Sequence, residues 1–214
     1  MIVELKCLEK NPGESADWPV RLSKAFRSTG HNFSDLMGYL VRGNPMPDKA
    51  RKKLISWLRE SIRETVKTAN RQVRSTKRIL EKGQAKGVLL VANDNNYGFT
   101  PEGMISILGD AAIRLNDSHL DAVVYFTPNV FHRKPDSDVA WHIWHPVYRE
   151  PENAAPLQEF INDLGRQWNE YVSIATGDPF VEKEELPNAE FADQAIKAML
   201  PVRGLGRSKK VSGA

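Results

Sequence analysis

Two short segments of the chain each contain an unbroken run of apolar residues, and they constrain the fold more than any other feature. Residues 87–93 read GVLLVAN, and residues 121–127 read DAVVYFT. A strand with one exposed face alternates apolar and polar residues, whereas a strand covered on both faces does not have to. We therefore expect both segments to be strands of a sheet, and the first to be covered by helices on both faces.

The first residues have a different pattern, which is typical of a strand with only one apolar face. In residues 1–9, Val3, Leu5 and Cys7 alternate with Glu4 and Lys6. Successive side chains of a strand point to opposite faces. The pattern therefore predicts that Cys7 is a buried thiol on the apolar face and that Glu4 and Lys6 share the other face.

Helical patterns separate the strands. Residues 48–82 have apolar residues at spacings of three and four with no internal Pro or Gly, which predicts one long amphipathic helix. Further helices are expected near residues 22–27, at 34–42 with Ser34 as cap, from Thr100 and Pro101 onward, and at 156–174 and 188–200. A third strand is expected within residues 139–148, forming a hairpin with residues 121–127.

This alternation predicts an α/β fold with a mixed β-sheet flanked by helices. We expect a single domain over residues 1–200 and a basic, disordered tail over residues 201–214.

Composition excludes several classes of protein. The 214 residues are 41% hydrophobic and 27% charged, and their apolar stretches are far shorter than a membrane-spanning helix. Cys7 is the only cysteine, so an internal disulfide is excluded and a cytoplasmic location is expected. The net charge of +3 does not by itself require a polyanionic partner.

Glu4 and Lys6 are the first candidates for chemistry. A carboxylate can hold a divalent cation that polarises a phosphodiester and activates water, and a neighbouring ammonium can offset the developing charge. The alternative is a solvent-exposed pair on an edge strand, because an E-x-K spacing also arises by chance.

The order of three segments adds context to this pair. The strand IVELKCLE, the helix containing ANRQVRSTKRIL and the strand KGVLLVAN resemble the core of the PD-(D/E)xK nuclease superfamily, which has the restriction-endonuclease-like fold. The resemblance covers about residues 1–93. It implies that Glu4 is a metal-binding carboxylate, that Lys6 is the catalytic lysine, that Gln72 is the polar residue on the helix, and that Mg²⁺ or Mn²⁺ is the cofactor.

The family pattern also places an acidic residue on the strand before E-x-K, and only Met1, Ile2 and Val3 precede it here. Three explanations are open: a start further upstream, a degenerate and inactive copy, or a carboxylate supplied from elsewhere in the chain. Asp94, which follows the end of a buried strand, is the candidate for the last explanation, and turn formation is the alternative role for this residue.

The long helix is strongly basic, with a surplus of eight positive charges between residues 48 and 82. Its candidate phosphate contacts are Arg59, Arg63, Lys67, Arg71, Gln72, Arg74 and Arg78. Such a stripe suits nucleic-acid binding, which salt would weaken. The alternative is a solvated face stabilised by local pairs such as Glu64 with Lys67.

His142 and His145 are three residues apart, so on a strand they would point to opposite faces and would not share a zinc ion. We expect Trp141, Trp144 and Tyr148 to belong to the core.

Taken together, the sequence predicts a metal-dependent nuclease with an E-x-K half-site, for which the three explanations of the missing acid stay open. The alternative is a non-catalytic module, on a nuclease-like fold, that binds nucleic acid or another protein. As partners the sequence favours DNA or RNA rather than a membrane, and it is compatible with a homodimer.

Overall fold

The computed structural model describes residues 1–8, 16–42, 47–94, 101–128, 132–133 and 140–177. Its strands are β1 (Ile2–Cys7), β2 (Gly87–Ala92), β3 (Ala122–Phe126), β4 (His132–Arg133), β5 (Ala140–Trp141) and β6 (Trp144–Tyr148). Its helices are α1 (Trp18–Ser28), α2 (Phe33–Arg42), α3 (Asp48–Ile79), α4 (Pro101–Ile113) and α5 (Ala155–Thr176), with a short 3₁₀ turn, η2 (Pro151–Asn153). The predicted α/β class is confirmed.

The main sheet has four strands in the order β1-β2-β3-β6. β1, β2 and β3 are parallel, and β6 is antiparallel to β3. The expected mixed sheet and the expected antiparallel pairing of the third strand are therefore confirmed, although that strand is divided into β5 and β6. β5 pairs with β4 in a separate small ribbon.

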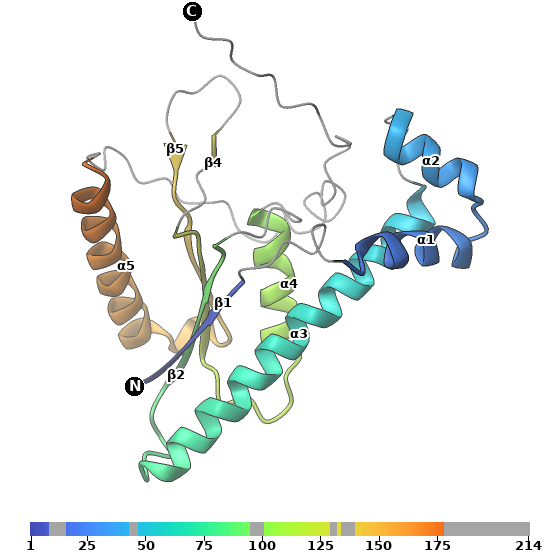
Figure 1. The fold of residues 1–214 in the computed structure, drawn as a ribbon. Coiled ribbons are helices and arrows are strands. Elements are labelled where there is room, and N and C mark those ends of the chain that lie inside the picture. Colours follow the sequence, from blue (N-terminus) through green and yellow to red (C-terminus); the bar gives the residue numbers. More distant parts are fainter. Residues whose placement is uncertain (9–15, 43–46, 95–100, 129–131, 134–139, 178–214) are drawn as a thin grey trace, which may run out of the picture.

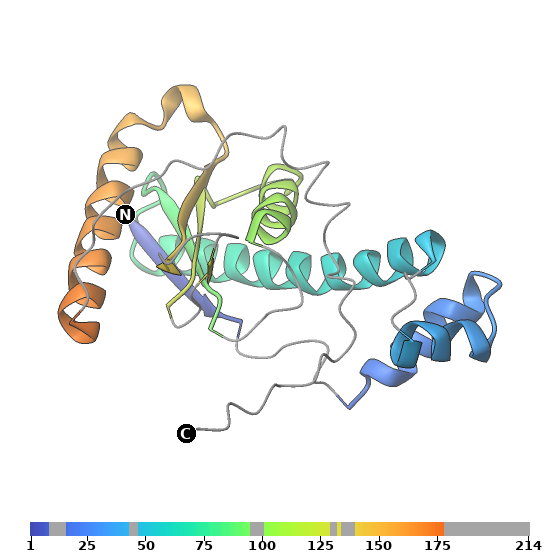
Figure 2. The same ribbon diagram turned by 90° about the horizontal axis from the view of Figure 1, so that it is seen from above.

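Helices cover both faces of this sheet, with α3 and α4 on one face and α5 on the other (Figures 1 and 2). The larger core lies beneath α3 and α4, where Val66 and Val73 of α3 pack with Leu89, Val91 and Tyr125 of the sheet. These side chains are all at most 1% exposed. β2 and β3 are thus covered on both faces, as their unbroken apolar sequences predict.

The opposite core is smaller and leaves part of the sheet uncovered. Leu157 and Ile161 of α5 pack on Val88, Ala122 and Val124. No residue of β1 belongs to this core among those that the structure describes. The edge strand therefore has a covered face toward α3 and an exposed face on the α5 side.

This arrangement contradicts the predicted location of Cys7. Cys7 is exposed, and its face also carries Val3 and Leu5, which are 42% and 59% exposed. The buried residue of β1 is Ile2, on the same face as Glu4 and Lys6. The alternation correctly indicates two unlike faces, but the more apolar of them is the one that α5 leaves exposed.

A third cluster lies at the N-terminal end of α3, away from the sheet (Figure 1). There Leu22, Ala25 and Phe26 of α1 pack on Leu36 of α2 and Leu54 of α3. The cap of α2 is also different from the prediction.

The backbone N–H of Asp35 donates to Asn32 Oδ1 at 3.0 Å, and the N–H of Asn32 donates to Asp35 Oδ2 at 2.9 Å. This reciprocal pair starts α2, so Ser34 is not the cap. The expected helix at 188–200, the tail at 201–214 and the Thr100 cap lie outside the described residues.

Candidate functional site

Glu4 and Lys6 form an ion pair on β1. Lys6 Nζ lies 2.8 Å from Glu4 Oε1, and each side chain is 24% exposed. Both point to the α3 side of the sheet, where Ile2 enters the core. The prediction that the acid and the amine share one face is confirmed, and the pair is half-buried rather than fully solvated.

The structure does not bring Asp94 to this pair. Glu4 lies opposite Leu89 in the β1–β2 register. Asp94 follows Leu89 by five positions, which is about 16 Å of extended chain. A cation held by both Glu4 and Asp94 is therefore disfavoured by the register.

The other candidate of this site is Gln72, which is exposed on α3. Within the described part of the chain, no hydrogen bond joins Gln72 to Glu4 or Lys6. The described part of the chain also contains no group of three or more His, Cys, Asp or Glu side chains that could hold a metal ion. The donors present for a cation at this site are thus the oxygens of Glu4.

The basic stripe of α3 divides into two halves. In the first half, Arg63 Nη2 lies 3.0 Å from Asp110 Oδ2 of α4, and Arg63 Nη1 lies 3.8 Å from Glu60 Oε2. Lys67 pairs with Glu64 and lies 3.8 Å from Glu60. The hydrogen bond between Lys67 and Glu64 raises the pKa of Lys67 and lowers the pKa of Glu64. These acids largely neutralise Arg63 and Lys67, whereas the half-buried Arg59 forms no ion pair with a described residue.

The second half keeps its charge. Arg71, Arg74 and Arg78 are all exposed, and none of them forms an ion pair with a residue that the structure describes. Arg71 Nη2 donates to the neutral Thr68 Oγ1 at 3.1 Å, and Glu64 acts on Arg71 only through a weak longer-range attraction. Positions 71, 74 and 78 fall on one side of the helix because they are three and four residues apart. We call these three residues the arginine face.

A buried polar cluster lies beyond the carboxyl ends of the parallel strands. Asn93 Nδ2 donates to Tyr125 Oη at 2.8 Å, and Asn93 is 2% exposed. Burial raises the pKa of Tyr125 to about 12, against the smaller opposing effect of the Asn93 hydrogen bond. Sequence reasoning missed this pair, because the two residues are 32 positions apart and belong to two apolar strands.

The two histidines have separate environments, as expected. His142 Nδ1 lies 3.0 Å from the carbonyl oxygen of Thr127, so this ring has a structural role. His145 lies opposite Tyr125 on the face covered by α3 and α4, and burial lowers its pKa. Trp144 and Tyr148 pack under α5, which confirms their assignment to the core, whereas the side chain of Trp141 lies outside the described residues.

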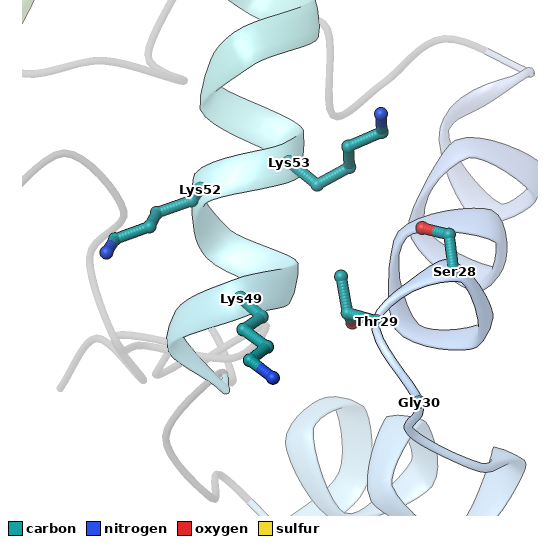
Figure 3. A pocket seen from close by; sticks show the side chains of 6 residues that line it. All are labelled: Ser28, Thr29, Gly30, Lys49, Lys52 and Lys53. Atoms are coloured by element: carbon teal, nitrogen blue, oxygen red, sulfur yellow. The ribbon is translucent and has the colours of Figure 1, made fainter.

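A second basic region surrounds a shallow hollow at the other end of α3, lined by Ser28, Thr29, Gly30, Lys49, Lys52 and Lys53. The lysines do not converge on one point, and Lys52 extends away from α1 (Figure 3). The hydroxyls of Ser28 and Thr29 donate to the Ala25 carbonyl at 3.1 and 2.8 Å. Their protons are therefore committed to α1, and the hollow is not a preformed anion cradle.

Comparison of this chain with protein families, with curated proteins and with solved structures found no match. Among the helices in the described ranges, none combines the length and the apolar character needed to cross a bilayer. Since no known protein supplies a function by similarity, the functional proposal is based on the side chains of β1 and α3.

Proposed function

We propose that this chain binds nucleic acid through the arginine face of α3. The single observation that carries the proposal is that Arg71, Arg74 and Arg78 are exposed on one side of a helix and form no ion pair with an acid among the described residues. The neighbouring Arg63 and Lys67, in contrast, are matched by Asp110, Glu60 and Glu64. Within the stripe of seven candidates, the arginine face is therefore where phosphates would be bound.

The physical basis is electrostatic and independent of base sequence. Three guanidinium groups along an α-helix can contact successive phosphates, and each such contact releases a condensed counterion. α3 also packs over much of its length on β1, α4 and α1, so the arginine face is carried by a rigid element.

The test is a salt titration with a triple variant. Short DNA and RNA duplexes and single strands would be titrated with the wild-type chain and with R71Q/R74Q/R78Q. We expect the slope of log affinity against log salt to fall by about 2 to 3 in the variant, about one for each lost phosphate contact.

The same helix offers a charge-matched control, K49Q/K52Q/K53Q, which removes three positive charges near the hollow. We expect it to retain most of the wild-type salt slope. Equal losses for both triple variants would show a nonspecific effect of net charge and would reject the arginine face as the binding site.

The second candidate function is metal-dependent phosphodiester hydrolysis, and the half-buried Glu4–Lys6 pair favours it. Glu4 Oε1 contacts Lys6 Nζ, and in this proposal the second carboxylate oxygen of Glu4 would bind the cation. In this proposal Glu4 supplies a Mg²⁺ ligand, Lys6 offsets charge on the phosphate, and the arginine face positions the substrate backbone. A restriction-endonuclease-like core is part of the same proposal.

Cleavage of labelled DNA and RNA with Mg²⁺, with Mn²⁺ and with chelator separates the two candidate functions. If the chain is a nuclease, Lys6→Ala abolishes the metal-dependent cleavage, and the exposed Lys82→Ala control leaves it intact. Binding without cleavage in any metal supports the non-catalytic module instead. Cleavage that survives Lys6→Ala removes the lysine from the mechanism.

A further inference from the structure

One hydrogen-bonding edge of β1 has no strand beside it among the residues that the structure describes. Its only strand neighbour in the described part of the chain is β2. The N–H of Ile2 donates to the Lys86 carbonyl at 2.8 Å, and the N–H of Leu8 donates to the Ala92 carbonyl at 2.7 Å. Backbone groups of alternate residues point to opposite sides of a strand. Even-numbered residues therefore bond to β2, and Val3 and Leu5 direct their N–H and C=O groups to the open edge.

The same strand exposes an apolar face. Val3 and Leu5 are 42% and 59% exposed, since α5 covers β2, β3 and β6 but not β1. Exposed apolar edge strands are templates for pairing with another strand.

We propose that this edge pairs with β1 of a second copy of the chain, in antiparallel orientation about a twofold axis. The two four-stranded sheets would then form one continuous sheet. A symmetric pair is the usual form of a soluble homo-oligomer, and each residue i opposite residue j is matched by j opposite i.

The hydrogen-bonding pattern restricts the register. Outward-directed residues must face outward-directed residues, so Leu5 lies opposite Val3, Leu5 or Cys7 of the second copy. If Leu5 lies opposite Val3, the two Glu4 side chains lie opposite each other. If Leu5 lies opposite Cys7, the two Lys6 side chains lie opposite each other.

Only the register centred on Leu5 is electrostatically complementary. It places Glu4 opposite Lys6 of the second copy, and by symmetry Lys6 opposite Glu4. These are non-hydrogen-bonded positions, where opposite Cα atoms are about 4.5 Å apart and side chains interact most strongly. On the other face, Leu5 meets Leu5 and Val3 meets Cys7 of the second copy, which buries the exposed apolar residues. The E-x-K spacing is therefore self-complementary.

The flank of α3 above the open edge fits the same arrangement. The flank toward α4 is identified by Arg63, which pairs with Asp110, and by Asn70, which donates to the Asp117 carbonyl. The opposite flank, over the edge, carries the uncharged residues Ser61, Thr65, Thr68, Gln72 and Thr76 at spacings of three and four. Two copies of α3 would approach through these flanks without opposing their positive charges.

The first test is the mass of the chain in solution without nucleic acid, by light scattering and sedimentation over a range of concentrations. We expect a species of twice the 24.1 kDa chain mass. E4K places Lys opposite Lys twice, and K6E places Glu opposite Glu twice, so each single variant should associate about tenfold to a hundredfold more weakly.

The decisive arm is a mixture. E4K carries Lys at positions 4 and 6, and K6E carries Glu at both, so the two chains are complementary only to each other. An equimolar mixture should form heterodimers, and the double variant E4K/K6E should form homodimers again. An effect of these residues within one chain cannot produce the heterodimer.

The register is tested by disulfide formation. In a Cys7→Ser background, Leu5→Cys places two thiols opposite each other and should give a covalent dimer under mild oxidation. Val3→Cys in the same background is the control, because Val3 lies about 14 Å along the strands from Val3 of the second copy. A single-chain mass at all concentrations overturns the proposal. So does a dimer that neither responds to the charge variants nor crosslinks at position 5. Neither result affects the nucleic-acid titration, which measures a different surface.

Discussion

β1 and β2 are neighbouring parallel strands of equal length, yet the chain uses them in opposite ways. β2 is covered by helices on both faces, and all its residues except Leu90 are buried. β1 is covered on one face only, and its buried residue is Ile2. The difference follows from the helices rather than the strands, because α5 reaches β2 and stops short of β1. A central strand thus contributes stability, and an edge strand retains side chains and backbone groups that can act on other molecules.

The largest expected effect of this contrast is a difference in stability between variants of two leucines. Leu89 in β2 is fully buried, whereas Leu5 in β1 is 59% exposed. We expect Leu89→Ala to lower the free energy of unfolding by about 4 kcal/mol, because it removes buried methyl groups and leaves a cavity. Leu5→Ala should change it by less than about 0.5 kcal/mol when chains are dilute enough to be single.

Chemical denaturation followed by circular dichroism would measure both variants. Equal losses for the two variants would show that the exposed face of β1 is covered in solution even in the single chain.

The second prediction concerns the start of β2, where backbone segments approach closely. A Cβ added at Gly87 would lie 2.1 Å from the His119 carbonyl oxygen and 2.8 Å from Val73 Cγ1. Since a backbone oxygen cannot move aside easily, we expect Gly87→Ala to destabilise the fold by about 3 kcal/mol. Gly83→Ala is the matched control, because nothing lies within 4 Å of its added Cβ. A thermal unfolding midpoint for Gly87→Ala close to that of Gly83→Ala would contradict the close packing of β2 against the His119 backbone and Val73 of α3.

The third prediction uses pH to probe β3, the other strand covered on both faces. The pKa of Tyr125 is raised to about 12 in the folded chain, so its neutral form is favoured there. This stabilisation is complete below the unfolded value of about 10 and is lost as the pH rises toward 12. A pKa shift of about two units corresponds to a loss of roughly 2 to 3 kcal/mol in the free energy of unfolding.

As the pH rises through the alkaline range, the free energy of unfolding should therefore fall more steeply for the wild type than for Tyr125→Phe. Tyr171→Phe serves as the control, because Tyr171 is 62% exposed. At neutral pH, Tyr125→Phe should cost about 1 kcal/mol, since the hydrogen bond from Asn93 is lost. An alkaline profile unchanged by Tyr125→Phe would mean that another group governs the loss of stability.

Local patterns were sufficient to predict the four strands of the main sheet and the long helix, but not the short strand β4, because periodicity indicates burial only over longer segments. They were sufficient for the Glu4–Lys6 contact as well, since residues two apart on a strand share a face. They failed for Cys7, because alternation distinguishes two faces without indicating which of them a distant helix covers.

The same limit explains the candidate site on α3. Spacing predicts a stripe of basic residues, but the pairing of Arg63 with Asp110 joins positions 47 residues apart and depends on how α4 packs. Local spacing predicts the pairs of Lys67 and Arg63 with Glu64 and Glu60, whereas the contact of Arg63 with Asp110 depends on the packing of α4.

The smallest predicted effect separates two histidines with lowered pKa values. Burial alone lowers the pKa of His145 on the antiparallel edge strand β6. For His119, burial is the first cause, and the positive charges of Lys77 and Arg74 lower its pKa further. In both cases the folded chain favours the neutral ring, so the stabilisation is present above the unfolded pKa of about 6.5 and is lost as the pH falls below it. His145→Gln and His119→Gln should each reduce the loss of unfolding free energy at acid pH. Each reduction should be smaller than the one that Tyr125→Phe causes at alkaline pH.

Salt distinguishes the two histidines, because it screens charges but does not alter burial. Added salt should reduce the contribution of His119 and leave that of His145 unchanged. An equal response of both histidines to salt would show that charge, rather than burial against the α3–α4 core, sets the protonation of His145. The His145 side chain on β6 would then be solvated like the exposed face of β1, and not covered like β3 beside it.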